Sequence, residues 1–171
     1  MVSVKQEEMI MRKDLLLRLA AALEMDAANP TGIKFDIGTW AAKDGYNADA
    51  DYDTNIPYLF KSETETVPVD CGTVACAVGF AAISGIFKDE GLTYKLKSAE
   101  GAYYLTPYFN GLDNFEAVGD FFEIDRWAVY HLFTGEGYEE KYDNRKLPVG
   151  AEGELAVAKQ IREFVAAADN I

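Results

Sequence analysis

The chain has 171 residues, of which 49% are hydrophobic and 26% are charged, a composition that suits one globular domain and excludes a disordered or collagen-like chain. Its 29 acidic side chains outnumber the 16 basic ones, which gives a formal net charge of −13. Such a charge repels phosphate backbones and anionic lipid, so we expect neither nucleic acid nor a membrane as a direct partner.

The cysteines and the first residues favour a cytoplasmic protein. Cys71 and Cys76 are the only cysteines, which is too few for a disulfide scaffold. Glu7 and Glu8 lie where a signal peptide would have its apolar segment. The longest apolar run, residues 74–87, is interrupted by glycine and serine and is shorter than the roughly 20 residues of a membrane span. We therefore expect reduced thiols and no transmembrane helix.

The first third of the chain contains one clear helical pattern. Apolar residues at steps of three and four predict a helix from Gln6 to Met25, and Pro30 and Gly32 end it. Residues 33–40 alternate between apolar and polar as far as Gly38, which predicts a short strand or extended segment. Residues 44–65 are acidic and typical of a loop.

The most apolar segment follows this loop. The pattern predicts a helix from Val74 to Ser84, opened by residues 70–73 and ended by Gly85. A helix that is apolar on every side is buried, so we expect it at the centre of the domain.

The second half of the chain predicts a hairpin and three further helices. Leu92 to Lys97 and Ala102 to Thr106 are β-prone runs that can pair as an antiparallel β-hairpin. Helices are expected from Asp113 to Phe122, from Asp125 to Leu132 and from Glu152 to Ala168, the last with Leu155, Ala158, Ile161 and Val165 facing inward. Together the elements predict a mostly helical α+β fold. We expect one domain over residues 1–171, with about five helices around the buried central helix and a small antiparallel β-hairpin on one side.

Cys71 is the candidate nucleophile of the chain. It precedes the predicted central helix, whose dipole would stabilise a thiolate and lower its pKa. The segment Asp70-Cys71-Gly72-Thr73-Val74-Ala75-Cys76 locally resembles the Cys-Gly-x-Cys segment of papain-like proteases and the Asp-Cys-Gly segment of bacteriocin-processing peptidases. In a catalytic arrangement His131, the only histidine, would be the base, and Asp143 or Asn144 would orient it.

The residues upstream of Cys71 depart from that pattern. Those enzymes place a glutamine a few residues before the cysteine, where this chain has Glu65 and Thr66. We therefore favour the interpretation that both cysteines are small buried hydrophobic residues. Two cysteines and one histidine are also too few for a closed zinc site, which needs four ligands.

An acidic segment before the cysteines has the oxygen ligands of a calcium loop at alternate positions, namely Asp49, Asp51, Asp53 and Asn55. The sixth position of that loop is Thr54 instead of glycine, and the twelfth is Phe60 instead of glutamate. We expect a solvated acidic loop, with calcium binding as the alternative, and no bound cofactor.

A second acidic pattern follows the helix predicted from Asp113. Steps of three, four and three residues place four carboxylates on one face, those of Asp113, Glu116, Asp120 and Glu123. Their spacing, about 5 to 6 Å, is close to that of phosphates along a nucleic-acid strand. The pattern is compatible with a solvated face of an acidic protein, and also with a surface that imitates phosphates and binds a basic protein.

Several segments taken together resemble a family of short uncharacterised proteins of bacteria and phages. They are Phe35-Asp36-Ile37-Gly38-Thr39-Trp40, Cys71-Gly72-Thr73-x-Ala75-Cys76-x-x-Gly79, Ala117 to Phe122 with Leu132-Phe133, and Ala158-x-x-Ile161-Arg162. Phe80 stands where that family often has histidine or tryptophan. The resemblance implies a phage or mobile-element origin and assigns no catalytic residue.

These observations lead to two functional hypotheses. The first is a small acidic accessory protein, not an enzyme, which binds a basic protein partner through the four carboxylates as an inhibitor or nucleic-acid mimic. The alternative is a thiol-dependent hydrolase that uses Cys71 with His131.

Overall fold

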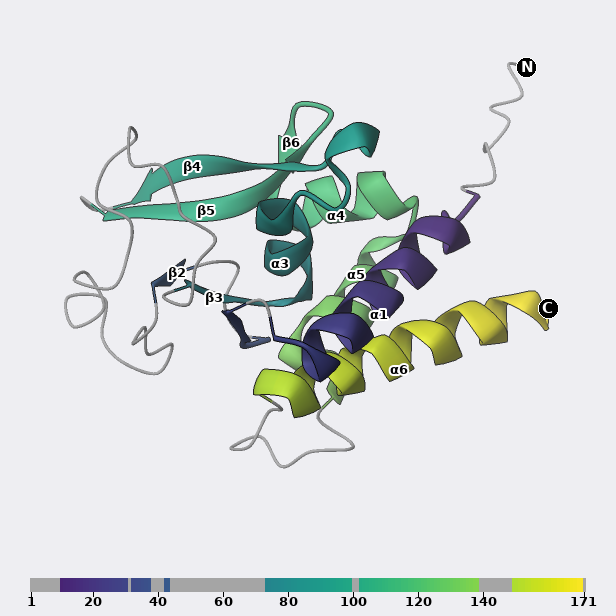
Figure 1. Ribbon diagram of the computed structural model, residues 1–171. Helices are drawn as coiled ribbons and strands as arrows, with labels where there is room; N and C mark the ends of the chain where they lie inside the picture. Colours follow the sequence, from purple (N-terminus) through teal and green to yellow (C-terminus); the bar gives the residue numbers. More distant parts are fainter. Residues whose placement is uncertain are drawn as a thin grey trace, which may run out of the picture.

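The computed structural model describes residues 10–30, 32–37, 42–43, 73–99, 102–138 and 149–170. Its elements, in chain order, are α1 (Lys13–Ala28), β1 (Ile33–Phe35), β2 (Ala42–Lys43), β3 (Thr73–Ala75), α3 (Ala77–Ser84), the 3-10 turn η2 (Lys88–Glu90), β4 (Thr93–Ala99), β5 (Ala102–Phe109), β6 (Leu112–Asp113), α4 (Asn114–Phe122), α5 (Arg126–Phe133), the 3-10 turn η3 (Gly135–Tyr138) and α6 (Gly150–Asp169). Helices take up more of these residues than strands do (Figure 1). The buried side chains form one hydrophobic core. The predicted α+β class is confirmed.

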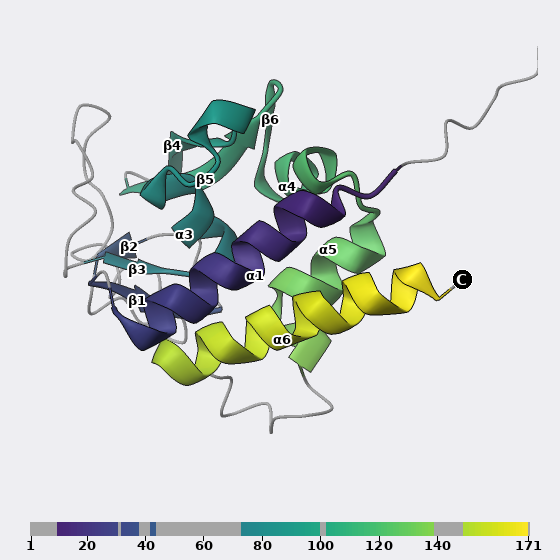
Figure 2. The same cartoon turned by 45° about the vertical axis from the view of Figure 1, so that its right-hand side comes forward.

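The two longest helices, α1 and α6, pack side by side and antiparallel (Figure 2). Leu16, Leu19 and Leu23 of α1 and Val157 and Ile161 of α6 are fully buried in the core. At the rim of this contact, Lys13 forms an ion pair with Asp169, and the guanidinium of Arg162 donates two hydrogen bonds, of 2.7 and 2.8 Å, to the carboxylate of Glu24. The pair thus has an apolar centre with exposed charges along its edges.

The helix expected from Val74 begins three residues later, at Ala77. Thr73–Ala75 form strand β3 instead, which pairs parallel with β1 and antiparallel with β2. Two flanking strands satisfy the backbone groups of this β-branched segment, so the extended form replaces a first helical turn. Cys76 is then the N-cap of α3, and its sulfur accepts a hydrogen bond from the Gly79 N–H at 3.4 Å.

Helix α3 is buried as predicted, since Ala77 and every following residue up to Ile83 are inaccessible to solvent or nearly so. Strands β4 and β5 cover one side of it, as expected for the hairpin, and α1 packs on another (Figure 1). Gly85 ends the helix in the left-handed conformation, with φ of 76°. The central helix therefore lies between a sheet and the helices, with helices on only part of its surface.

The predicted hairpin is confirmed and is longer than expected. β4 and β5 pair antiparallel from Thr93↔Tyr108 to Ala99↔Ala102. A third strand, β6, pairs with the end of β5 through Tyr108↔Asp113 and Phe109↔Leu112, and leads directly into α4. The sheet therefore fixes where α4 starts.

The ends of the chain also depart from the expected boundaries. α1 begins at Lys13 and not at Gln6, which lies outside the described residues, and it ends at Ala28. In α6, Ala158, Ile161 and Val165 face inward as predicted, whereas Leu155 is 50% exposed. The buried face of α6 passes through Glu154 and Val157, and Leu155 falls outside it.

Two carboxyl groups are buried where the end of α1 meets the start of α6. Asp26 and Glu154 are each only 3% exposed. Burial, together with the hydrogen bond to Asp26 and the charge of that residue, raises the pKa of Glu154 to about 8. At neutral pH Glu154 is therefore mostly protonated, and its carboxyl proton forms the hydrogen bond to Asp26.

This pair predicts a stability that depends on pH. The unfolded chain releases the proton of Glu154 near its ordinary pKa of 4.5, whereas the folded chain keeps it until about pH 8. The free energy of unfolding should therefore be highest below the unfolded pKa and fall as the pH rises through this window. Urea unfolding at a series of pH values measures this slope. Glu154→Gln should flatten it and the exposed Glu152→Gln on the same helix should not; equal slopes in both variants would contradict the assignment.

Candidate functional site

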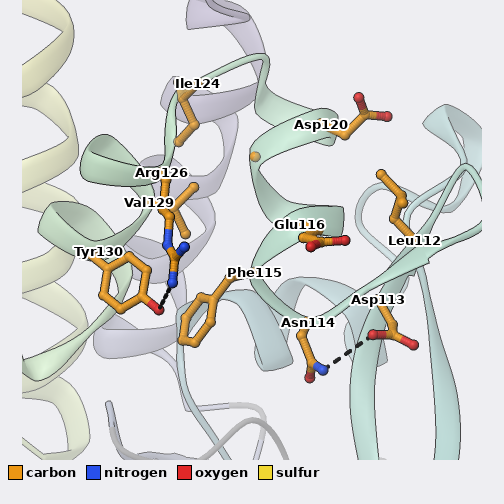
Figure 3. A pocket seen from close by; sticks show the side chains of 11 residues that line it. Leu112, Asp113, Asn114, Phe115, Glu116, Asp120, Ile124, Arg126, Val129 and Tyr130 are labelled. Atoms are coloured by element: carbon orange, nitrogen blue, oxygen red, sulfur yellow. Dashed lines mark hydrogen bonds between the residues drawn. The ribbon is translucent and has the colours of Figure 1, made fainter.

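A groove of about 660 Å³ lies between α4 and α5, beside strand β6 of the β4–β5–β6 sheet. Its described lining residues are Leu112, Asp113, Asn114, Phe115, Glu116, Gly119, Asp120, Ile124, Arg126, Val129 and Tyr130. Figure 3 shows the acidic side chains along α4 and its N-cap, with the side chains of Arg126 and Tyr130 coming from α5. Three of the four carboxylates that the sequence analysis singled out line this one groove.

The start of α4 is anchored by a side chain from β5. The N–H of Asn114 donates to the hydroxyl oxygen of Thr106 at 3.1 Å, and that hydroxyl donates to Asn114 Oδ1 at 2.8 Å. Thr106 is 1% exposed, so these bonds are shielded from water. Asn114 has a φ of 54°, a left-handed conformation that asparagine adopts more readily than most residues. The sheet thereby sets the position of the acidic helix.

The carboxylates follow α4 from its N-cap into its second turn. Asp113 is the N-cap residue, but its side chain makes no capping hydrogen bond and accepts one from Asn114 Nδ2 at 3.2 Å. Glu116 and Asp120 are exposed, and Asp120 accepts a hydrogen bond from Asn110 Nδ2 at 3.1 Å. Glu116 and Asp120 thus present two solvent-accessible carboxylates along the groove.

Glu123, the fourth predicted residue, does not line the groove. α4 ends at Phe122, and Glu123 is its C-cap in the left-handed conformation, with φ of 52°. The N–H of Ile124 then donates to the Gly119 carbonyl at 3.0 Å, which turns the chain away from the helix axis. The charge of Glu123 acts on Arg12, whose pKa is raised mainly by its hydrogen bond to Asp14 and less by Glu123.

Aromatic and cationic groups complete the groove. The rings of Phe115 and Tyr130 stack with centroids 5.0 Å apart, and the Arg126 guanidinium lies over the Tyr130 ring, 5.5 Å from its centroid. Arg126 also donates a hydrogen bond of 3.4 Å to the Tyr130 hydroxyl, which raises the pKa of Arg126, with a smaller contribution from Glu116. The described lining residues thus include one guanidinium and three carboxylates, and the groove combines negative charge with an aromatic surface.

Phe115, Arg126 and Tyr130 are site residues that the sequence patterns do not predict. The sequence does indicate that Arg126 and Tyr130 are neighbours, because residues four apart lie on one face of a helix. Their position opposite the carboxylates depends on how α5 packs against α4. Gly119 contributes to that packing, since a Cβ there would lie 3.5 Å from Val129 Cγ2 of α5 and 3.1 Å from the Ile124 carbonyl oxygen in the connection between the two helices.

Several candidate residues lie outside the described part of the chain. These are Cys71, the possible orienting residues Asp143 and Asn144, and the calcium candidates Asp49, Asp51, Asp53 and Asn55. His131, the proposed base, is on α5, where its ring stacks on Trp127 with centroids 4.9 Å apart. The pairing of Cys71 with His131 stays a prediction.

Cys76, the second cysteine, is 2% exposed. Burial raises its pKa to about 11, although the hydrogen bond from the Gly79 N–H opposes this shift. Cys76 is therefore a protonated thiol at neutral pH and acts as the N-cap of α3, as expected for a structural cysteine. Within the described ranges, no group of three or more His, Cys, Asp or Glu residues is arranged to hold a metal ion, and no helix is long and apolar enough to cross a membrane.

Comparison of the chain with models of protein families, with curated proteins and with solved structures finds no match. The resemblance to short bacterial and phage proteins therefore stays a prediction.

The Thr106 anchor gives a first test of this geometry. Thr106→Val keeps the shape of the side chain but removes both hydrogen bonds to Asn114, so the free energy of unfolding should fall by about 1 to 3 kcal/mol. Chemical unfolding measures the change. Thr93→Val on the exposed side of β4 is the matched control and should change it by less than about 0.5 kcal/mol; equal losses would show that α4 does not depend on Thr106.

Thiol reactivity gives a second test. In a Cys71→Ser variant the only remaining thiol is Cys76, which should resist an alkylating reagent in the folded state and react fully after unfolding in urea. Rapid labelling of the folded variant would contradict the burial of Cys76. Parallel labelling of the unmodified chain reports the rate of Cys71, and a slower rate in His131→Ala is the result that the hydrolase hypothesis requires.

Proposed function

We propose that the protein binds a basic segment of a protein partner in the groove between α4 and α5. The observation that carries this proposal is the presence of Asp113, Glu116 and Asp120 in one groove with the stacked rings of Phe115 and Tyr130. The volume, about 660 Å³, suits a few side chains of a partner and not a whole helix.

The chemistry of the groove matches lysine and arginine side chains. Carboxylates accept charge-assisted hydrogen bonds from ammonium and guanidinium groups. The aromatic pair offers ring faces to their aliphatic stems or to a guanidinium plane, and Arg126 over Tyr130 is an example of that contact within the chain. The net charge of −13 adds long-range attraction, which accelerates encounter with a basic partner.

The partner we favour is a cytoplasmic protein whose basic surface otherwise binds nucleic acid. Glu116 and Asp120 are four residues apart on α4, and the Cβ atoms of such a pair lie about 5 to 6 Å apart, which is similar to the separation of phosphates along a strand. Occupying such a surface would inhibit the partner, a role that suits the accessory protein of a phage or mobile element implied by the resemblance. Competition between this protein and an oligonucleotide for the partner is the diagnostic feature of this mode of action.

Charge reversal in the groove tests the proposal. In the double variant Glu116→Lys, Asp120→Lys, binding to an array of short peptides rich in lysine and arginine should weaken by at least about tenfold at physiological salt, which corresponds to about 1.4 kcal/mol. The variant should stay folded, because the change removes like-charge repulsion on one helix face. Fluorescence anisotropy measures binding, and a thermal melt checks the fold.

The matched control is Asp89→Lys, Glu152→Lys, which changes the net charge by the same amount at exposed positions outside the groove. We expect it to lose much less affinity than the groove variant. Equal losses would mean that binding follows overall charge, and an undiminished affinity of the groove variant would exclude the groove as the binding site.

A further inference from the structure

A second hollow, of about 500 Å³, lies on another face of α5, where it meets η3 and α6. Aromatic rings come from Trp127 and His131 of α5 and from Phe164 of α6, and carboxylates come from Glu136 of η3 and Glu163 of α6. The groove of the proposed function uses Arg126, Val129 and Tyr130 of α5 instead, so the two features are distinct.

The walls of this hollow are held together by hydrogen bonds. The side-chain amide of Gln160, which is 3% exposed, donates to the carbonyl oxygen of His131 at 2.6 Å and to that of Gly137 at 3.0 Å. η3 lies directly on the end of α5, because a Cβ at Gly137 would come within 1.8 Å of the His131 carbonyl oxygen. The three elements are thus fixed relative to one another, and the hollow is preformed.

Its aromatic groups include an exposed tryptophan. Trp127 is 66% exposed, and its ring stacks on that of His131 with an angle of 7° between the planes. The ring of Phe164 is tilted against that of His131, with centroids 6.3 Å apart and an angle of 44° between the planes. The stack covers one face of the indole, and the rest of Trp127 remains accessible at the hollow.

The charged side chains among the described lining residues are both acidic. Glu136 and Glu163 are exposed, and Lys159, which does not line the hollow, lies 3.9 Å from Glu163 Oε1 and offsets part of its charge. The hollow therefore combines π faces with negative charge. An anionic ligand would be repelled by both, and a purely apolar one would gain nothing from the carboxylates.

We propose that this hollow binds an organic cation whose nitrogen carries apolar substituents, such as a trimethylammonium group. Ring faces attract a cation electrostatically, and an alkylated nitrogen is more weakly hydrated than a bare ammonium, so it loses less solvation on entering an aromatic site. Glu136 and Glu163 balance its charge at the rim. This inference does not depend on the basic partner of the other groove.

A matched pair of probes separates charge from shape. Choline carries a trimethylammonium group, and 3,3-dimethylbutan-1-ol is its neutral isostere. In amide-resolved NMR titrations at constant ionic strength, choline should shift the Trp127 indole and Gly137 amide signals saturably, with an affinity at least about tenfold higher than that of the alcohol. The absence of a saturable shift, or equal affinities for the two probes, would overturn the proposal.

Variants locate the binding. Trp127→Leu should remove saturable binding of choline, and Trp127→Phe should retain part of it. Glu136→Gln should weaken the binding severalfold. The control Glu152→Gln, at the exposed start of α6, should leave the binding unchanged. Trp127 and Glu136 are exposed, so these variants should fold, and unchanged signals away from the hollow verify this. Unaltered binding in Trp127→Leu would place choline elsewhere and overturn the proposal.

A trimethylammonium group occurs in small metabolites and on trimethylated lysine, and a further pair of probes distinguishes these sources. They are a short peptide that contains trimethyllysine and the same peptide with unmodified lysine. Tighter binding of the trimethylated peptide than of choline would identify a modified protein tail as the ligand. Equal affinity for choline and the trimethylated peptide would identify a small molecule as the ligand. Equal affinity for the trimethylated and the unmodified peptide would overturn the proposal.

Discussion

The antiparallel packing of α1 on α6 determines where the other helices of the described chain can lie. Leucines of α1 and Val157 and Ile161 of α6 bury the apolar faces of two long helices against each other. α6 in turn holds α5, because the amide of Gln160 satisfies two carbonyl oxygens at the end of α5 and in η3. α5 then forms one side of the groove and one side of the hollow. Both candidate sites therefore depend on a core contact that neither of them contains.

The distribution of charge follows from this arrangement. Four basic side chains, those of Arg12, Lys13, Arg18 and Arg162, form ion pairs around α1. Exposed pairs of this kind contribute little to stability, but they neutralise acidic groups on that side of the molecule. The described lining residues of the groove include one guanidinium for three carboxylates, so part of the excess negative charge of the chain is concentrated there. Attraction of a basic partner would consequently be strongest where the aromatic contacts also lie.

Local sequence patterns predicted the elements whose neighbours are close in the chain. The inward residues Ala158, Ile161 and Val165 of α6 and the β4–β5 hairpin are examples. The helix expected from Asp125 is another, and Asp125 is its N-cap, where its carboxylate accepts a hydrogen bond from the Ala128 N–H at 2.8 Å. Segments whose secondary structure depends on pairing with residues distant in the chain were predicted wrongly. Residues 74–83 are small or apolar and show no period, and pairing with β1 and β2 made the first of them a strand. The spacing of the carboxylates on α4 was visible, whereas the contact of Thr106 with Asn114 and the approach of α5 depend on tertiary packing.

The position of Gly137 also has a consequence for how relatives of this protein can be recognised. Any larger residue there would collide with the backbone of α5, and the neighbouring Tyr138 donates a buried hydrogen bond of 2.9 Å to the Leu132 carbonyl. A chain that keeps this helix end therefore requires glycine at position 137, and Tyr138 and Gln160 are the side chains that satisfy the carbonyl oxygens around it, even if its surface carboxylates differ. Such backbone requirements diverge more slowly than surface charge. Glycine and tyrosine followed by a distant glutamine would thus be a more durable signature of the fold than the acidic residues of α4.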